Sequence, residues 1–262
     1  MLAACVLASV LPAAGATRYD PSFRFRSMTT PHFVIHYHQG EEALALRLYL
    51  IVERVHTDLT GRMQHAPGGR THVVLVDQAD DPNGWATPVP YNLIEITAVP
   101  PAGAEAIGNT SEWLRLVFTH EYAHVIHLDR SRGWAALARG VFGRAPFAFP
   151  NLTLPLWHIE GLATFEESRA GEGRLAAGDF RAIVAEAARA GAFEPLDRVS
   201  GGLADWPAGM GWYAYGAYFH DYLARRFGED TLAELSRRTA GRLPYFGATA
   251  FRTVYGLSLI HI

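Results

Sequence analysis

Two histidines four residues apart, with a glutamate directly after the first, constrain this chain more than any other feature. They are His120 and His124, and the glutamate is Glu121. On an α-helix, residues four apart lie one turn apart on the same face, so both imidazoles can bind one metal ion. Glu121 then lies about 100° around the helix, where a carboxylate can reach a metal-bound water without being a ligand. The spacing therefore predicts a helix that carries the metal site of a zinc hydrolase.

The flanking residues predict one amphipathic helix around this motif. Capping residues stand at 109–112, and residues 129–133 end the helix. Its apolar residues would form a buried surface; they are Trp113, Leu114, Leu116, Val117, Phe118, Val125, Ile126 and Leu128. A pair of structural histidines held by hydrogen bonds is the alternative to a metal site. Burying two histidines and a glutamate side by side without a metal would be costly, so we prefer the metal interpretation.

A second stretch, at 155–167, contains a candidate for the third metal ligand. It resembles the W-x-x-E-G-[FL]-A-x-[YF]-x-E helix of the gluzincins, the thermolysin and aminopeptidase N group of zinc peptidases. The resemblance implies that the glutamate before glycine, Glu160, is the third zinc ligand. Two neutral imidazoles and one carboxylate leave the fourth position of a tetrahedral zinc ion for water, which is typical of catalytic sites. The small residues Gly161 and Ala163 would let this helix approach the helix of His120 closely.

Nearly the whole chain after residue 16 resembles the bacterial peptidase-MA-like proteins. The resemblance lies in residues 30–33 and 83–86, the two metal-site stretches, and residues 213–216. It implies an α+β fold of the thermolysin and aminopeptidase type, with a small N-terminal mixed β-sheet lobe, a mainly helical lobe and zinc in the cleft between them. These gluzincin domains are often followed by a tricorn or Tol-type β-propeller, so we expect one as a C-terminal partner in the full-length protein.

These observations divide the chain into four parts. Residues 1–16 form a signal peptide, 17–110 an N-terminal α/β lobe and 111–256 a helical zinc-binding lobe. Residues 257–262 have no helix cap or turn residues, so we expect a truncated or foreign tail. Within the first lobe, side-chain periodicity predicts strands at 33–38, 71–77 and 92–97, a helix at 41–60 and a turn at 80–84.

By resemblance, the strand at 91–97 edges the cleft and pairs with extended substrate. Its residues Asn92, Ile94 and Glu95 are therefore candidate substrate-binding residues. The aminopeptidases of the group bind the free amino end of a substrate through a G-x-M-E-N segment, which this sequence lacks. Glu95 is the only acidic residue on the strand, and a surface or supporting role suits it better. We therefore favour an endopeptidase over an aminopeptidase.

The helical lobe supplies further candidates. Helices are predicted at 179–190, 211–227 and 230–240. Residues 213–216 resemble the Y-x-x-G helix start of aminopeptidase-type gluzincins, which implies that Tyr213 donates a hydrogen bond to the oxyanion. Tyr215 is the alternative donor, and aromatic packing is the structural alternative for both. Thr164, one turn after Glu160, could orient a ligand. His127 shares the face of His120 and His124, but three histidines on one straight helix cannot all meet one tetrahedral ion, so it supports the site or belongs to the core.

Together these residues predict a single catalytic zinc ion. His120, His124 and Glu160 hold it, Glu121 is the general base towards a zinc-activated water, and Tyr213 stabilises the oxyanion. The expected function is a zinc metallopeptidase acting on peptide or protein substrates. A zinc-dependent hydrolase of a non-peptide amide would share every metal residue, and a non-catalytic exported binding scaffold is the third hypothesis.

The first sixteen residues predict export. Met1 to Ala16 is apolar and ends in an A-x-A pattern, typical of a signal peptide cleaved before Thr17. The mature protein would be periplasmic, secreted or associated with the outer membrane of a bacterium. Residues 2–5 resemble a lipobox, so lipidation at Cys5 is the alternative. A net charge of −3, with 49% hydrophobic and 19% charged residues, describes a globular protein without the basic field that nucleic acid requires.

The connector at 133–156 is rich in apolar side chains. They are Trp134, Leu137, Val141, Phe142, Phe147 and Phe149, interrupted by Arg139, Arg144 and several prolines. Such a segment beside a cleft could be a lid or could contact a membrane surface. The simpler interpretation, which we prefer, is a covering layer of the core.

Overall fold

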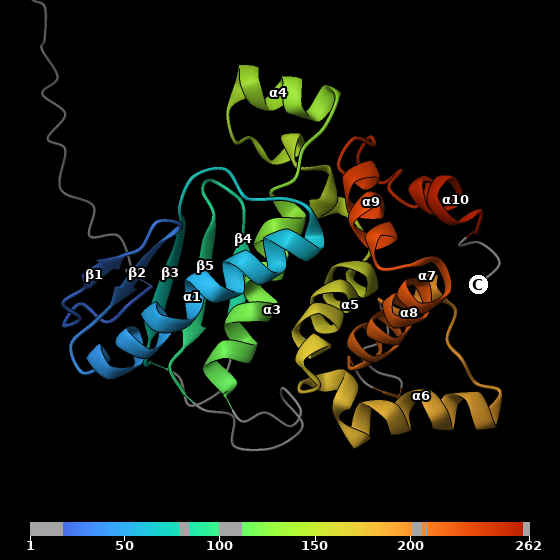
Figure 1. Cartoon of the computed structure of the whole chain (residues 1–262), viewed down its shortest axis with the longest axis horizontal. Coiled ribbons are helices and arrows are strands. Elements are labelled where there is room, and N and C mark those ends of the chain that lie inside the picture. The colour runs from blue at the N-terminus through green and yellow to red at the C-terminus, as the bar shows by residue number, and fades with distance from the viewer. Residues whose placement is uncertain (1–17, 79–83, 100–111, 201–205, 208, 259–262) are drawn as a thin grey trace, which may run out of the picture.

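The computed structural model describes residues 18–78, 84–99, 112–200, 206–207 and 209–258 (Figure 1). The predicted signal peptide with Cys5, the capping residues 109–111, most of the predicted turn at 80–84 and the last four residues of the tail lie outside these ranges. Among the described helices, none combines the length and the apolar character that a membrane crossing needs.

A five-stranded mixed sheet forms the N-terminal part. Its order is β1-β2-β3-β5-β4, with the three central strands parallel and both edge strands antiparallel to their neighbours. The strands are β1 (Arg26–Thr29), β2 (Phe33–Tyr37), β3 (Thr71–Val76), β4 (Gly84–Thr87) and β5 (Leu93–Thr97). The helix α1 (Glu42–Met63) connects β2 to β3. The predicted α+β class, with a small N-terminal mixed sheet followed by helices, is confirmed.

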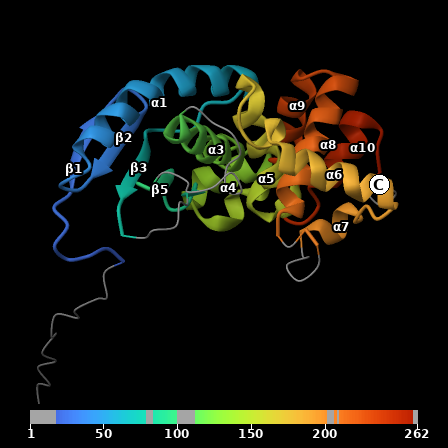
Figure 2. The same ribbon diagram turned by 90° about the horizontal axis from the view of Figure 1, so that it is seen from below.

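One face of the sheet packs against α1 and against α3 (Trp113–Leu128), the helix of the His-Glu motif (Figure 2). The ring of Phe33 on β2 lies 5.3 Å from that of Phe118 and 5.0 Å from that of Tyr122, both on α3. The Tyr122 hydroxyl forms a 2.6 Å hydrogen bond with Nδ1 of His56 on α1. Because successive strand residues point to opposite faces, this core takes every second residue of β2, β3 and β5.

The opposite face of the sheet carries the intervening residues. Glu95 of β5 lies there and accepts hydrogen bonds from Arg18 at 2.5 Å, Tyr19 at 2.5 Å and the Trp85 indole at 3.0 Å. Glu95 is 6% exposed, so the segment that precedes β1 covers it. This arrangement fastens the N-terminal residues to the sheet on the side away from α3.

The remaining chain is helical. Its α-helices are α4 (Trp134–Phe142), α5 (Leu156–Glu167), α6 (Gly178–Ala190), α7 (Leu196–Val199), α8 (Gly211–Phe227), α9 (Asp230–Thr239) and α10 (Thr249–Tyr255). Short 3₁₀ turns lie between them: η1 (Pro146–Ala148), η2 (Pro150–Thr153), η3 (Ser168–Ala170) and η4 (Arg174–Ala176). The predicted helices at 179–190, 211–227 and 230–240 correspond to α6, α8 and α9 within one residue at each end.

The helices α5 and α8 touch at two glycines. A Cβ added at Gly216 would lie 2.1 Å from the backbone oxygen of Trp157 and 2.8 Å from the Cα of Gly161. A Cβ at Gly161 would lie 2.4 Å from the carbonyl carbon of Gly216. We expected Gly161 to allow close contact with the His120 helix; this is wrong, because its bare face meets α8.

The identity of the edge strand also differs from expectation. The short strand β4, which has no alternating pattern of apolar residues, pairs outside β5 and leaves β5 inside the sheet. The prediction that the strand at 91–97 forms the edge is therefore wrong. The edge next to α3 is β4, Gly84–Thr87.

The connector after α3 covers the core only in its second half, where Phe149 and Leu154 are 1% and 8% exposed; its first half, α4, does not. In α4 only Ala135 is buried, while Leu137, Val141 and Phe142 are 72%, 66% and 66% exposed. Between the two halves, Arg144 forms a 2.8 Å ion pair with the buried Asp129 at the end of α3. Arg144 also donates to the Asn92 side chain at 2.6 Å and to the backbone oxygen of Pro88. It thereby joins the end of α3 to the loop between β4 and β5.

Candidate metal centre

Three side chains from two helices converge at one point. Nε2 of His120 and Nε2 of His124, both on α3, lie 3.1 Å apart. The Oε2 atom of Glu160 on α5 lies 3.2 Å from each of them. Among the described residues, these three form the one group of histidine, cysteine or acidic side chains placed to hold a metal ion together.

The spacing of these atoms fits zinc. Donors bound at 2.0–2.1 Å to a tetrahedral ion lie about 3.3 Å apart, close to the separations found here. Two imidazoles and one carboxylate are also the donor set of catalytic zinc sites. The histidine side chains are 7% and 8% exposed and that of Glu160 is 19% exposed, so solvent reaches the group from the Glu160 side.

Glu167 orients His120, a role that the sequence analysis did not assign. Its Oε2 atom lies 2.6 Å from Nδ1 of His120, on the far side of the ring from Glu160. Burial alone would lower the pKa of His120, but the carboxylates of Glu167 and Glu160 outweigh it and raise the pKa to about 9. A carboxylate on the second nitrogen fixes the tautomer and orientation of a metal-binding histidine. Glu167 follows Glu160 by seven residues, two helical turns, so the spacing was a signal for this role.

Arg174, in η4, extends this support. Its Nη1 atom lies 3.5 Å from Oε2 of Glu167 and donates at 3.3 Å to the hydroxyl of Thr164. Its guanidinium also lies over the ring of Tyr213, 4.6 Å from the centroid. The predicted role of Thr164 thus changes in detail, because its hydroxyl bonds Arg174 and reaches the ligands only through it. Neither spacing nor motif pointed to Arg174.

The Glu121 carboxylate lies between α3 and the edge strand. It is 6% exposed, and its Oε2 atom has no hydrogen-bond partner among the described residues. Burial raises the pKa of Glu121, although His120 and His124 oppose that effect. A Cβ at Gly84, the first residue of β4, would lie 2.7 Å from Oε1 of Glu121. The carboxylate therefore occupies the space that a side chain at position 84 would fill.

If Glu121 is the general base of the predicted zinc hydrolase, Gly84→Ala should lower kcat for hydrolysis by about 10- to 100-fold, because the added methyl group displaces the Glu121 carboxylate. Zinc content and Tm should change little, since the contact is with the end of a side chain that can shift. The measurements are kcat, zinc per chain and thermal unfolding. Gly68→Ala is the matched control, because a Cβ there meets nothing within 4 Å. An unchanged kcat in Gly84→Ala would contradict the role given to this glycine.

Tyr213 and Tyr215 lie in different places. The ring of Tyr213 lies 6.3 Å from that of His120, and burial, followed by the nearby Glu160 carboxylate, raises its pKa. Tyr215 packs its ring against Phe193 at 5.5 Å, and its buried hydroxyl has no partner among the described residues. Of the two candidate donors, Tyr213 is the one beside the metal ligands.

His127 lies behind the site in a row of buried histidines. Its ring centroid is 5.2 Å from that of His158, and Nδ1 of His158 lies 2.8 Å from Nε2 of His220. Burial lowers the pKa of His220 to about 4 and lowers those of His127 and His158 well below the usual value. Both ring nitrogens of His127 have no partner among the described residues. Of the two roles considered for His127, its surroundings fit the core rather than support of the ligands.

The candidate substrate-binding residues are engaged elsewhere. Asn92 is 2% exposed and bonds Arg144 and the backbone of Gly68. Ile94 is fully buried in the core beneath the helices. Glu95 points to the opposite face of the sheet, as described above. These positions do not favour a substrate-binding role. Side chains of β5 point alternately into the core and to the face of the sheet away from α3, and the Asn92 side chain is already hydrogen-bonded.

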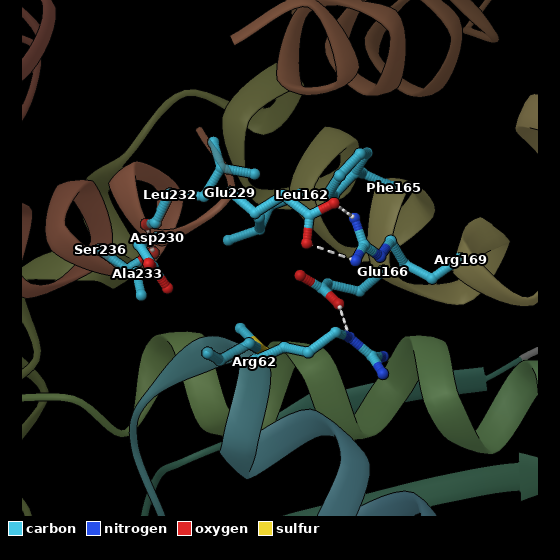
Figure 3. Close-up of a pocket in the computed structure, with 11 residues that line it drawn as sticks. Arg62, Leu162, Phe165, Glu166, Arg169, Glu229, Asp230, Leu232, Ala233 and Ser236 are labelled. Carbon is cyan, nitrogen blue, oxygen red and sulfur yellow. Dashed lines mark hydrogen bonds and ion pairs between the residues drawn. The ribbon is translucent and has the colours of Figure 1, made fainter. Parts of the chain in front are cut away.

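Two cavities lie on the other side of α5 and α3. The larger, about 440 Å³, is lined by α1, α3 and α5 and includes Glu167 in its wall. The smaller, about 130 Å³, contains the ion pairs Arg62–Glu166 and Arg169–Glu229 (Figure 3). The pair Arg62–Glu166 joins α1 to α5, and the pair Arg169–Glu229 joins η3, which follows α5, to the residue before α9.

The comparisons with known proteins concern the fold. A mutant M1 zinc metallopeptidase from Deinococcus radiodurans, bound to a Tyr-Ser-Ala substrate, matches with a TM-score of 0.50 and 15% identity over 91% of this chain and 50% of that chain. An aminopeptidase N family protein from Idiomarina loihiensis matches with a TM-score of 0.46 and 12% identity over 92% of this chain and 46% of that chain. The chain thus spans about half the length of these proteins. No family model and no curated protein matches the sequence.

Proposed function

We propose that this protein is a zinc-dependent peptidase. The observation that carries the proposal is the convergence of three donor atoms, 3.1–3.2 Å apart, together with the nearby Glu121 carboxylate, whose Oε2 atom has no partner among the residues that the structure describes. The similarity of the fold to M1 zinc metallopeptidases supports it. His120, His124 and Glu160 would hold the ion. Zinc in such a set supplies a Lewis acid that polarises a carbonyl and acidifies water.

The chain's own residues then carry out proton transfer and charge stabilisation. Glu121 takes a proton from the attacking water and gives it to the leaving amine. A raised pKa suits this task, because the carboxyl group can hold the proton between the two transfers. The phenolic O–H of Tyr213 donates a hydrogen bond to the oxyanion that forms at the substrate carbonyl. Glu167 and Arg174 keep His120 and Tyr213 in position.

The substrate class follows from the edge strand. An extended peptide can add to β4 through backbone hydrogen bonds, since within the described part of the chain β4 is bonded on one side only, to β5. Gly84, the first residue of β4, lies against the Glu121 carboxylate, so a peptide paired with β4 would lie close to the proposed general base. We infer an endopeptidase, because the sequence has no G-x-M-E-N segment and Glu95 is already bonded to three partners. Export, from the apolar residues 1–16, remains part of the proposal.

The purified chain should contain about one zinc ion and cleave casein or a peptide library. A chelator should remove the activity and added zinc should restore it, because hydrolysis needs the Lewis acid that the bound zinc ion supplies. Peptides with an acetylated amino end should be cleaved as well as free ones. A requirement for a free amino end would indicate an aminopeptidase, and hydrolysis of small non-peptide amides alone would overturn the peptidase proposal.

Proton release gives a control that does not depend on activity. With a pKa of about 9, His120 is protonated at pH 7 in the zinc-free protein and has to lose that proton to bind zinc. Zinc binding at pH 7 should therefore release about one proton from His120, and this release should disappear above pH 9. Calorimetry in two buffers of different ionisation enthalpy measures it. Absence of zinc binding would favour the non-catalytic scaffold.

A further inference from the structure

The helix α4 and a neighbouring loop expose a group of large apolar side chains. Figure 1 shows α4 standing out from the rest of the fold. The exposed side chains, here called the α4 surface, are Leu137, Val141, Phe142 and Phe147 around α4, and Tyr245 and Phe246 in the loop before α10. All six are at least half exposed, and Tyr245 reaches 84%. Scattered single apolar residues are common on proteins, but a group of this kind marks an interaction site.

The chain on either side of α4 is bonded to the chain between α9 and α10. The backbone nitrogen of Tyr245 donates to the Thr153 hydroxyl at 3.1 Å, and the backbone nitrogen of Arg132 donates to the oxygen of Ala240 at 3.0 Å. The rings of Phe142 and Phe147 lie 5.6 Å apart. The segments that carry the apolar side chains are therefore joined by backbone hydrogen bonds both before and after α4.

Charge sets this part of the chain apart. Residues 130–159 contain four of the 23 basic residues and none of the 26 acidic ones, although the whole chain is acidic. Arg132 is exposed, and Arg139, Arg144 and Arg242 are partly exposed. The buried Asp129 beneath them is paired with Arg144 at 2.8 Å and with Arg139 at 3.4 Å. The outer surface is consequently apolar and basic.

We propose that the α4 surface docks the protein on an anionic lipid bilayer. A short helix with aromatic and aliphatic side chains outward and arginines beside them is suited to lie at the boundary of headgroups and acyl chains. Arginines without neighbouring exposed carboxylates complement anionic headgroups. With nine residues, α4 lies on a bilayer and does not cross it. The projecting shape suits a fluid surface better than a partner's groove. The proposal does not depend on the proposed peptidase activity.

Co-sedimentation with lipid vesicles tests the proposal. The full chain should bind vesicles of phosphatidylcholine and phosphatidylglycerol more tightly than vesicles of phosphatidylcholine alone, and high salt should weaken binding. The double variant Phe142→Ser with Phe147→Ser should weaken vesicle binding about tenfold or more, because it removes two apolar rings that the bilayer would otherwise bury. The matched control is Leu50→Ser with Phe193→Ser, which removes exposed apolar side chains elsewhere (68% and 52%) and should bind as the parent chain does.

Three results would overturn the proposal. The first is equal binding of the Phe142/Phe147 double variant and the parent chain, which share the same apolar N-terminal residues. The second is equal binding to neutral and anionic vesicles, or no binding to either. The third is a double variant that binds vesicles as the parent chain does but differs from it in molecular mass by sedimentation velocity. That result would assign the α4 surface to contact between copies of this chain. Circular dichroism verifies that both double variants are folded.

Discussion

Replacing Glu121 with Gln is expected to lower kcat for peptide hydrolysis by about 10²–10⁴-fold while zinc remains bound. The amide has nearly the shape of the carboxylate but cannot accept the proton from water. The three metal donors are separate side chains, so their positions should not change. Steady-state kinetics and metal analysis of the same preparation measure the two effects.

A surface exchange of the same kind provides the control. Glu186→Gln on α6 removes a side-chain charge that is 59% exposed, and kcat should stay the same. Retention of peptidase activity in Glu121→Gln would remove Glu121 from the role of general base. Loss of zinc together with activity would instead point to an effect on the metal site as a whole.

Gly216→Ala is expected to lower the free energy of unfolding by at least about 2 kcal/mol. The added methyl group would lie 2.1 Å from the Trp157 oxygen and 2.8 Å from the Cα of Gly161. These are backbone atoms, so α5 and α8 would have to separate. For a chain of this size, the expected fall in Tm is about 4–8 °C. Thermal and urea unfolding measure it.

Gly61→Ala separates steric conflict from helix propensity. Gly61 also lies inside a helix, α1, but a Cβ there meets nothing within 4 Å. Alanine favours helix over glycine by up to about 1 kcal/mol, so this variant should be as stable as the parent or more stable. Equal stability of Gly216→Ala and Gly61→Ala would contradict the close contact between α5 and α8.

The convergence of the three candidate metal donors could be predicted because local sequence spacing determines much of their arrangement. Four residues along one helix place His120 and His124 together whatever the rest of the fold, and the motif around Glu160 supplied the third donor. The helical boundaries followed from periodicity and from glycine at helix ends. The position of Glu167 is just as local, two turns after Glu160, and the quoted motif already contained it.

The remaining features depend on contacts between distant segments. The strand β4 has four residues, all partly exposed, so no alternation marks it, and its place outside β5 decides which strand forms the edge. Arg174 reaches Tyr213 and Glu167 only in the folded chain. Gly161 was recognised as a point of close approach, but sequence alone could not tell which helix approaches it.

Arg144 has a consequence for the direction from which substrates arrive. One guanidinium holds both the segment that follows α4 and the loop that ends β4. On a docked molecule, this side chain would thus help to fix the distance between the lipid headgroups and β4, the strand proposed to pair with substrate. Polypeptides already confined near the bilayer, such as the extramembrane tails of membrane proteins, would then reach the active residues more often than chains free in solution.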